Sequence, residues 1–232
     1  MSGMATDAIR PQAEDRAYFA HVFAWMGVAL GITGIVSGVL GHSQHALYAL
    51  LNGSSWLFIA LLIIELVLVM GLVGLVQHMD LFEAATIFLG YAALNGVTIS
   101  VIFAIYTTKS IYATFFITAG MFGALALVGY TTSIDLTRWG SYLMMALFGL
   151  IIGLVVNIFW LNSTLYWATT VVGVLLFSAL TAYDVQRLKR YEPPAGSEGA
   201  TVEKDAIVGA LALYLDFVNL FLYLLRLFGR RR

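Results

Sequence analysis

The sequence contains no cysteine and few charged residues among its 232 positions. Without cysteine, no disulfide, thiolate metal site or cysteine nucleophile can form. Charged residues make up 11% of the chain and hydrophobic residues 61%, whereas a soluble domain carries roughly 25% charge. No basic stripe indicates a nucleic-acid partner. The composition therefore predicts an integral membrane protein that contacts the lipid bilayer and not nucleic acid.

The N-terminal residues also lack the features of a cleaved signal peptide. Residues 1–18 are polar and mixed in charge, with no basic start, short apolar run or small-residue cleavage site. We expect the first membrane segment to be retained. The expected organisation is a polar N-terminal segment (1–18), one transmembrane domain (19–228) and a basic tail (229–232).

Seven stretches are long and apolar enough to cross a bilayer, which takes about 20 residues per helix. Uninterrupted runs of this length exclude a transmembrane barrel, whose strands alternate over about ten residues. The polar stretch 189–205 is expected to be a mobile loop. The sequence thus predicts an all-α membrane protein with helices near 19–40, 55–77, 82–105, 111–131, 139–160, 166–188 and 206–228.

Basic residues give a weak indication of orientation, because they favour the cytoplasmic side. With the N-terminus inside, seven lysines and arginines face inward, and Lys109 and the four C-terminal arginines face outward. We expect the N-terminus in the cytoplasm, although the arginine-rich tail opposes this assignment.

Glycines recur at helical spacing in two of the predicted helices. Gly27, Gly31, Gly34 and Gly38 fall on one face of the first helix, and Gly149 and Gly153 repeat the pattern in the fifth. Small residues on one face allow helices to approach closely in membranes. We expect these glycines to serve packing only.

Two aspartates lie within the last two predicted helices. A carboxylate in hydrocarbon costs at least about 2.5–3.5 kcal/mol on insertion scales, so it needs a partner, water or a function. Asp216 is ten residues into its helix, whereas Asp184 lies closer to a helix end and could instead pair with Arg187 in inner-side water. The sequence does not settle whether the two reach the same depth.

Other polar residues could join the two aspartates. Glu65 lies midway along the second predicted helix, and Asn219 follows Asp216 by three residues on the same helix face. Asn95 and Asn157 are expected to form hydrogen bonds within the membrane. Asp184, Asp216, Glu65 and Asn219 are therefore the candidate pH-sensing and ion-pathway residues.

If the carboxyl groups of Asp184 and Asp216 lie close together, their acid–base behaviour can be predicted. Two close carboxylates cannot both ionise cheaply, so they share a proton and titrate as a unit. Deprotonation would add repulsion between the helices and attract a cation. Calcium prefers six to eight oxygen ligands, so Asp184 and Asp216 would bind it weakly and transiently. We expect no cofactor, with calcium and protons as the ions that pass.

Four stretches of the chain together resemble the Bax-inhibitor-1 (transmembrane Bax inhibitor motif) family, in particular its bacterial branch. They are LYLDFVNLFLYLLRLFG (213–229), LTAYDVQRLK (180–189), GYTTSIDLTRWG (129–140) and YAALNGVTIS (91–100). The resemblance implies a seven-helix bundle with the C-terminal helix at its centre. It also implies a pH-regulated calcium leak in the bacterial inner membrane, with Asp184 and Asp216 as the sensing pair and Glu65 as the acidic residue of helix two.

The chain departs from this family at the inner end of the second helix. Some bacterial relatives place an arginine there that can latch an aspartate, whereas this chain has Val76, Gln77 and His78. A permanently charged latch is therefore absent. His78, when protonated, and Arg187 are the candidate replacements.

Three other functions compete with an ion channel. An intramembrane aspartyl protease also pairs two aspartates, but its Gly-x-Gly-Asp motif is replaced by Leu213, Tyr214 and Leu215 before Asp216. We therefore expect no enzymatic activity. A retinal protein is excluded because the last predicted helix has no lysine. A non-conducting regulator that binds another membrane protein, such as a membrane protease, remains the main alternative.

Overall fold

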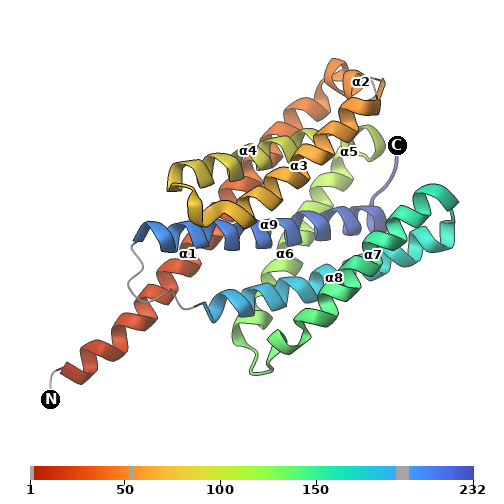
Figure 1. The fold of residues 1–232 in the computed structure, drawn as a ribbon. Coiled ribbons are helices and arrows are strands. Elements are labelled where there is room, and N and C mark those ends of the chain that lie inside the picture. Colours follow the sequence, from red (N-terminus) through yellow and green to blue (C-terminus); the bar gives the residue numbers. More distant parts are fainter. Residues whose placement is uncertain (1–2, 53–54, 192–198) are drawn as a thin grey trace. The chain divides into compact units, whose positions relative to one another are not determined.

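The computed structural model describes residues 3–52, 55–191 and 199–232, and within these ranges the chain is helical and contains no strand (Figure 1). Seven helices are long and apolar enough to cross a membrane, which confirms the predicted fold class. They are α1 (Gly3–His42), α3 (Ser55–Leu75), α4 (Leu81–Ile99), α6 (Thr108–Thr131), α7 (Gly140–Trp160), α8 (Ser163–Lys189) and α9 (Gly199–Phe228). Four short helices connect them: α2 (Gln44–Asn52), η1 (Val76–His78), α5 (Ile102–Ile105) and η2 (Leu136–Trp139).

Two helices begin well before their predicted starts: α1 begins at Gly3, with its apolar span from Tyr18, and the last helix also begins early. The sequence predicted a loop through residue 205, but α9 begins at Gly199, so this part of the prediction was wrong; residues 192–198 lie outside the described ranges. The early turns of α9 carry charged residues whose polar atoms find partners. Lys204 Nζ donates to the carbonyl of Met79 at 3.1 Å, and Gln77 donates to Asp205 at 2.8 Å.

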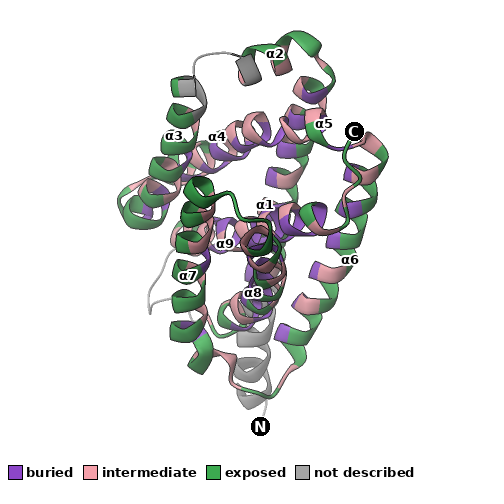
Figure 2. Ribbon diagram, turned by 90° about the vertical axis from the view of Figure 1, so that its right-hand side faces the viewer, coloured by how far each residue is buried: buried purple, intermediate pink, exposed green. Residues whose placement is uncertain are grey.

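The chain forms two compact units. The first unit comprises residues 1–105 and 191–214, and α4 packs there against both α1 and α3. The second unit comprises residues 106–190 and 215–232, and α8 packs there against both α6 and α7. Helix α9 contributes its first part to the first unit and its second part to the second unit. Its residues are mostly buried, whereas those of α7 are mostly exposed (Figure 2). The central position of α9 stays a prediction.

Local sequence explains where individual helices begin. At the start of α4, Asp80 accepts from the backbone N–H of Glu83 at 2.7 Å, and Glu83 accepts from the N–H of Asp80 at 3.0 Å. This capping box satisfies two N–H groups that the helix itself leaves without partners. Asn162 performs the same task for α8 by accepting from the N–H groups of Thr164 and Leu165.

The predicted glycine faces do not make close contacts in the described structure. A Cβ built at Gly27, Gly31, Gly34, Gly38 or Gly149 would meet nothing within 4 Å, and only Gly153 approaches a side chain, Thr169 at 3.1 Å. The packing role predicted for the first five glycines was therefore wrong, because regular spacing places residues on one face without supplying a partner for it. Close helix approach occurs instead at Gly129, where a Cβ would lie 2.3 Å from the carbonyl oxygen of Ala182.

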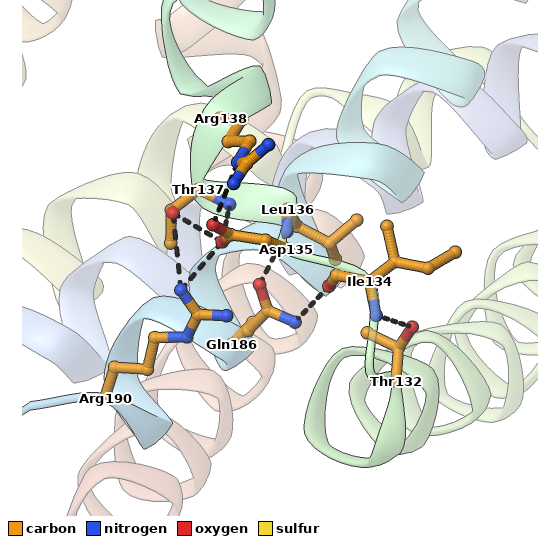
Figure 3. A network of polar contacts seen from close by, with 8 residues as sticks. All are labelled: Thr132, Ile134, Asp135, Leu136, Thr137, Arg138, Gln186 and Arg190. Atoms are coloured by element: carbon orange, nitrogen blue, oxygen red, sulfur yellow. Dashed lines mark hydrogen bonds and ion pairs between the residues drawn. The ribbon is translucent and has the colours of Figure 1, made fainter.

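A polar network fixes the connection between α6 and α7 to the end of α8 (Figure 3). Buried Gln186 accepts from the N–H of Leu136 at 2.7 Å and donates to the carbonyl of Ile134 at 2.8 Å. Asp135 lies beside them and forms ion pairs with Arg190 at 2.7 Å and Arg138 at 3.3 Å. Hydrogen bonds from Thr137 and Arg190 lower the pKa of Asp135. Asp135 therefore stays ionised, and keeps its ion pairs, until the pH falls through that lowered value.

We expect Gln186→Leu to destabilise the protein by about 1 kcal/mol, because it leaves the backbone N–H of Leu136 and the carbonyl of Ile134 without their side-chain partner at a partly buried position. Thermal unfolding in detergent measures the change. Arg138→Gln is the control on the same connection, since it removes only the ion pair of an exposed side chain, which contributes little to stability. Equal effects of the two variants would show that the Gln186 amide does not hold this connection.

Candidate functional site

Asp184 of α8 and Asp216 of α9 both lie in the second unit, and their carboxyl groups lie within hydrogen-bonding reach of each other. Two ionised carboxylates are both acceptors, so a bond between them requires a proton on one of the two. The structure thus brings together the two aspartates whose relative depth the sequence left open.

The environment of Asp216 is apolar and closed. Its side chain is 4% exposed, and its Oδ2 atom has no hydrogen-bond partner within the described ranges. The next residue, Phe217, packs edge-to-face against Phe122 and Phe115 of α6 with ring centroids 5.5 Å apart in both cases. A buried polar atom without a partner is rare in folded proteins. This buried oxygen therefore requires a proton, a water molecule or a cation to satisfy it.

Asn219 and Arg187 contribute less directly to this pair. The Asn219 amide donates to the carbonyl of Leu215 in its own helix at 2.8 Å, which leaves its oxygen as the atom available to a cation. Arg187 lies three residues beyond Asp184 on α8 and attracts it electrostatically. It forms no ion pair with Asp184, because both ion pairs among the described residues belong to Asp135.

Glu65 occupies a second polar site, in the first unit. It is 8% exposed and accepts from the hydroxyl of Thr98 at 2.8 Å and from the amide of Asn95 at 3.4 Å. These bonds connect α3 to α4. The hydrogen bonding predicted for Asn95 between helices is therefore present, and Glu65 is one of its partners.

The site around Glu65 extends through residues that the sequence analysis did not single out. Asn95 also accepts from the hydroxyl of Tyr214 at 3.0 Å, and that hydroxyl lies 2.8 Å from Thr33 Oγ1. Thr33 donates onward to the carbonyl of Ala92 at 2.8 Å. The hydrogen-bonded chain thus joins α1, α3, α4 and the first part of α9. Thr98 and Tyr214 gave no sequence signal, because single hydroxyl residues are common in membrane helices.

At the C-terminal end of the second membrane helix, where some relatives have an arginine, this chain has the neutral side chain of Gln77, which contacts an aspartate. Gln77 of η1 donates to Asp205 Oδ1 at 2.8 Å, and Tyr191 donates to Asp205 Oδ2. Burial, followed by the contact with Asp205, raises the pKa of Tyr191, so it remains a neutral donor. His78 is exposed beside Gln77. The aspartate held at this end is therefore Asp205, a residue that the sequence analysis placed in a loop.

The described residues contain no group of three or more histidine, aspartate or glutamate side chains arranged to hold a metal ion. Asp184 and Asp216 supply at most four carboxylate oxygens between them, fewer than the six to eight ligands of a calcium storage site.

Comparison with known protein families identifies one matching model. The family described as "Inhibitor of apoptosis-promoting Bax1" matches residues 15–232 of this chain. The match covers all of the residues discussed above, including both aspartates and Glu65.

Similar bacterial proteins match over nearly their whole length. The inner membrane protein YbhL of Escherichia coli is 44% identical over 226 residues, which cover 97% of this chain and 96% of that protein. An uncharacterized protein of Borreliella burgdorferi is 41% identical, with 93% and 92% covered. The uncharacterized protein RP147 of Rickettsia prowazekii is 40% identical, with 94% and 91% covered.

Proposed function

This chain belongs to the Bax inhibitor-1 family of multi-pass membrane proteins, and on that basis we propose that it is a pH-sensitive calcium-leak channel gated by Asp184 and Asp216. The observation that carries the proposal is the pair of carboxyl groups within hydrogen-bonding reach, with Asp216 buried and its Oδ2 without a partner. We place the protein in the bacterial inner membrane, as for the E. coli relative YbhL, with its N-terminus in the cytoplasm.

The gate works through the shared proton. At acidic pH one proton bridges the two carboxyl groups and holds α8 and α9 together at this point. When the proton leaves, the two negative charges repel each other. For two unit charges at about 4 Å and an effective dielectric constant of about 20, such a repulsion is about 4 kcal/mol. Separation of the carboxylates, or entry of a cation between them, relieves this repulsion. Calcium leak therefore increases as the pH rises.

Glu65 has a related role in the first unit. Its carboxyl group is buried and held by Thr98 and Asn95, and it provides a second acidic group within the membrane-spanning part of the chain. We propose that it attracts the permeating ion, while the Asp184–Asp216 pair controls whether the ion passes.

The surroundings of Asp216 argue against an enzymatic function. Leu213 and Tyr214, which precede it, are fully buried at 0% exposure. An intramembrane protease that pairs two aspartates has small Gly-x-Gly residues before the second one, whereas this chain has the bulky Leu213, Tyr214 and Leu215 there. The proposal therefore includes no catalytic activity and no cofactor.

The direct test is calcium flux from liposomes that contain the purified protein, measured from mildly acidic to mildly alkaline pH. We expect leak above that of protein-free liposomes, increasing with pH. Circular dichroism of the same proteoliposomes confirms that the protein is folded. If folded protein leaks no calcium at any pH, the channel proposal is wrong, and a non-conducting regulator of another membrane protein becomes the better interpretation.

A further inference from the structure

The basic C-terminal tail is folded back onto the second unit. Thr107 donates its backbone N–H to the carbonyl of Arg230 at 3.0 Å, and the N–H of Arg230 donates to Ser110 Oγ at 3.0 Å. A backbone bridge between Tyr106 and Arg231 completes the contact. These bonds fix the arginines of residues 229–232 beside the start of α6.

Aromatic rings contact Arg231 of the tail and Arg226 near the end of α9. The guanidinium of Arg226 lies 5.4 Å from the ring centre of Tyr223 and 5.9 Å from that of Tyr166. Arg231 lies 6.0 Å from the ring centre of Tyr166 and donates to its hydroxyl at 3.2 Å. Such contacts orient a guanidinium without neutralising its charge. Both arginines are exposed, and each keeps further N–H donors for an outside partner.

This end of the second unit has five positively charged side chains and no acidic side chain. Arg226, Arg230, Arg231, Arg232 and Lys109 lie here, and residues 106–112, 160–167 and 226–232 contain no aspartate or glutamate. The unit has only three acidic residues. Asp135 lies at the far ends of α6 and α8, Asp184 is near that same end of α8, and Asp216 is ten residues before Arg226, about 15 Å along the helix. Among the described residues, none of the tail arginines forms an ion pair with a carboxylate.

The cluster also lies where a membrane surface is expected. Helix α9 ends at Phe228, two residues after Arg226. Trp160 at the end of α7 and Trp167 near the start of α8 are 78% and 63% exposed. Tryptophan and tyrosine are typical of the level of the lipid headgroups. Guanidinium groups bind phosphate oxygens with paired hydrogen bonds, and basic residues next to membrane helices attract anionic lipids.

We propose that the arginine–tyrosine cluster formed by Arg226, Arg231 and Tyr166 binds the phosphate of an anionic phospholipid headgroup. The neighbouring Arg230, Arg232 and Lys109 add attraction for the same negative charge. The site is independent of ion conduction, because it involves neither of the aspartates nor Glu65.

Fluorescence quenching by brominated lipids tests this site, with Trp167 as the reporter next to Tyr166. The four other tryptophans are replaced by phenylalanine, and the protein is reconstituted with brominated phosphatidylglycerol or brominated phosphatidylcholine at equal mole fractions. We expect the anionic lipid to quench Trp167 more strongly. Arg226→Gln and Arg231→Gln should each reduce the binding preference roughly five-fold, the factor expected for one basic residue at an anionic surface, and the double variant should remove it.

Two further variants separate specific binding from general effects. Arg226→Lys with Arg231→Lys keeps both charges and should retain part of the preference, because lysine cannot form the paired hydrogen bonds. Arg138→Gln removes one exposed arginine from the other end of the unit and should change nothing at Trp167. Equal quenching by the two lipids in the parent protein would overturn the proposal, as would an unchanged preference in the double glutamine variant. Removal of the preference by soluble inorganic phosphate would assign the cluster to free anions and also overturn it.

Discussion

Replacement of Asp216 by asparagine is expected to abolish the pH dependence of calcium flux and to hold the flux at its low, acidic-pH level. The asparagine amide is neutral at every pH, and its N–H can donate to Asp184 as the shared proton does. The electrostatic repulsion that opens the pair is then lost. Because a repulsion of this kind is about 4 kcal/mol, flux at alkaline pH should fall by at least about tenfold. The measurement is calcium efflux from proteoliposomes over a pH series.

Additional aspartate variants make this experiment specific. Asp184→Asn should have the same effect, and the double variant should be no more impaired than either single one, because the two carboxyl groups titrate as a unit. Asp135→Asn is the matched control from the same unit. Asp135 is outside the membrane spans, and its lowered pKa keeps it ionised across the assay range, so its replacement should leave the slope of flux against pH unchanged.

The outcomes separate two proposals: that the protein conducts calcium, and that the Asp184–Asp216 pair controls this conduction. If the native protein conducts calcium and Asp216→Asn retains the full pH dependence, the channel proposal stands and the di-aspartyl gate is wrong. If the native protein does not conduct, the variants cannot be compared and the channel proposal itself fails. A lipid preference at the C-terminal cluster is measured separately and does not depend on either result.

Hydropathy predicted the seven spanning helices because a membrane span requires a long apolar run, and this chain has seven of them. The same reasoning missed the start of α9. Residues such as Lys204 and Asp205 are polar, so the sequence indicated a loop, but contacts with Met79 and Gln77 satisfy them within a helix. Hydropathy indicates which residues are apolar enough to lie in the bilayer. It does not locate the first residue of a helix whose early turns are polar and form hydrogen bonds with other elements.

The aspartates were recognisable from sequence because a carboxylate in an apolar helix is costly, and this argument needs no knowledge of the fold. Their meeting was not predictable, since it depends on how far α8 and α9 are displaced along each other. The network around Glu65 was only partly predictable. Glu65 and Asn95 are conspicuous in apolar runs, whereas Thr33, Thr98 and Tyr214 acquire their role only when α1, α3, α4 and α9 bring them together.

The glycines also show that contacts between helices cannot be predicted from the sequence of one helix alone. Regular spacing drew attention to Gly27, Gly31, Gly34 and Gly38, where an added Cβ meets nothing within 4 Å. Gly129, whose Cβ position lies against the backbone of another helix, is not part of such a glycine series. A close approach between two helices is a property of both partners, and a single glycine can be enough if the opposite backbone lies against it.

Gly129→Ala is expected to destabilise the protein by about 3 kcal/mol, at the upper end of the usual cost of overpacking. Its new Cβ would lie 2.3 Å from the carbonyl oxygen of Ala182 and 2.9 Å from the Ala182 Cα. Both are backbone atoms, so no side-chain rotation relieves the clash, and α6 and α8 must move apart. Because Ala182 lies two residues before Asp184, the movement should also weaken the carboxyl pair and raise calcium leak at acidic pH.

Gly123→Ala on the same helix is the control, because a Cβ there meets nothing within 4 Å. It should be neutral or slightly stabilising, since alanine is favoured over glycine within a helix by up to about 1 kcal/mol. Thermal unfolding in detergent and calcium efflux at acidic pH are measured for both variants. If Gly129→Ala matches Gly123→Ala in stability, α6 and α8 are not in backbone contact. If it is destabilised without added leak, the contact is structural and does not position Asp184.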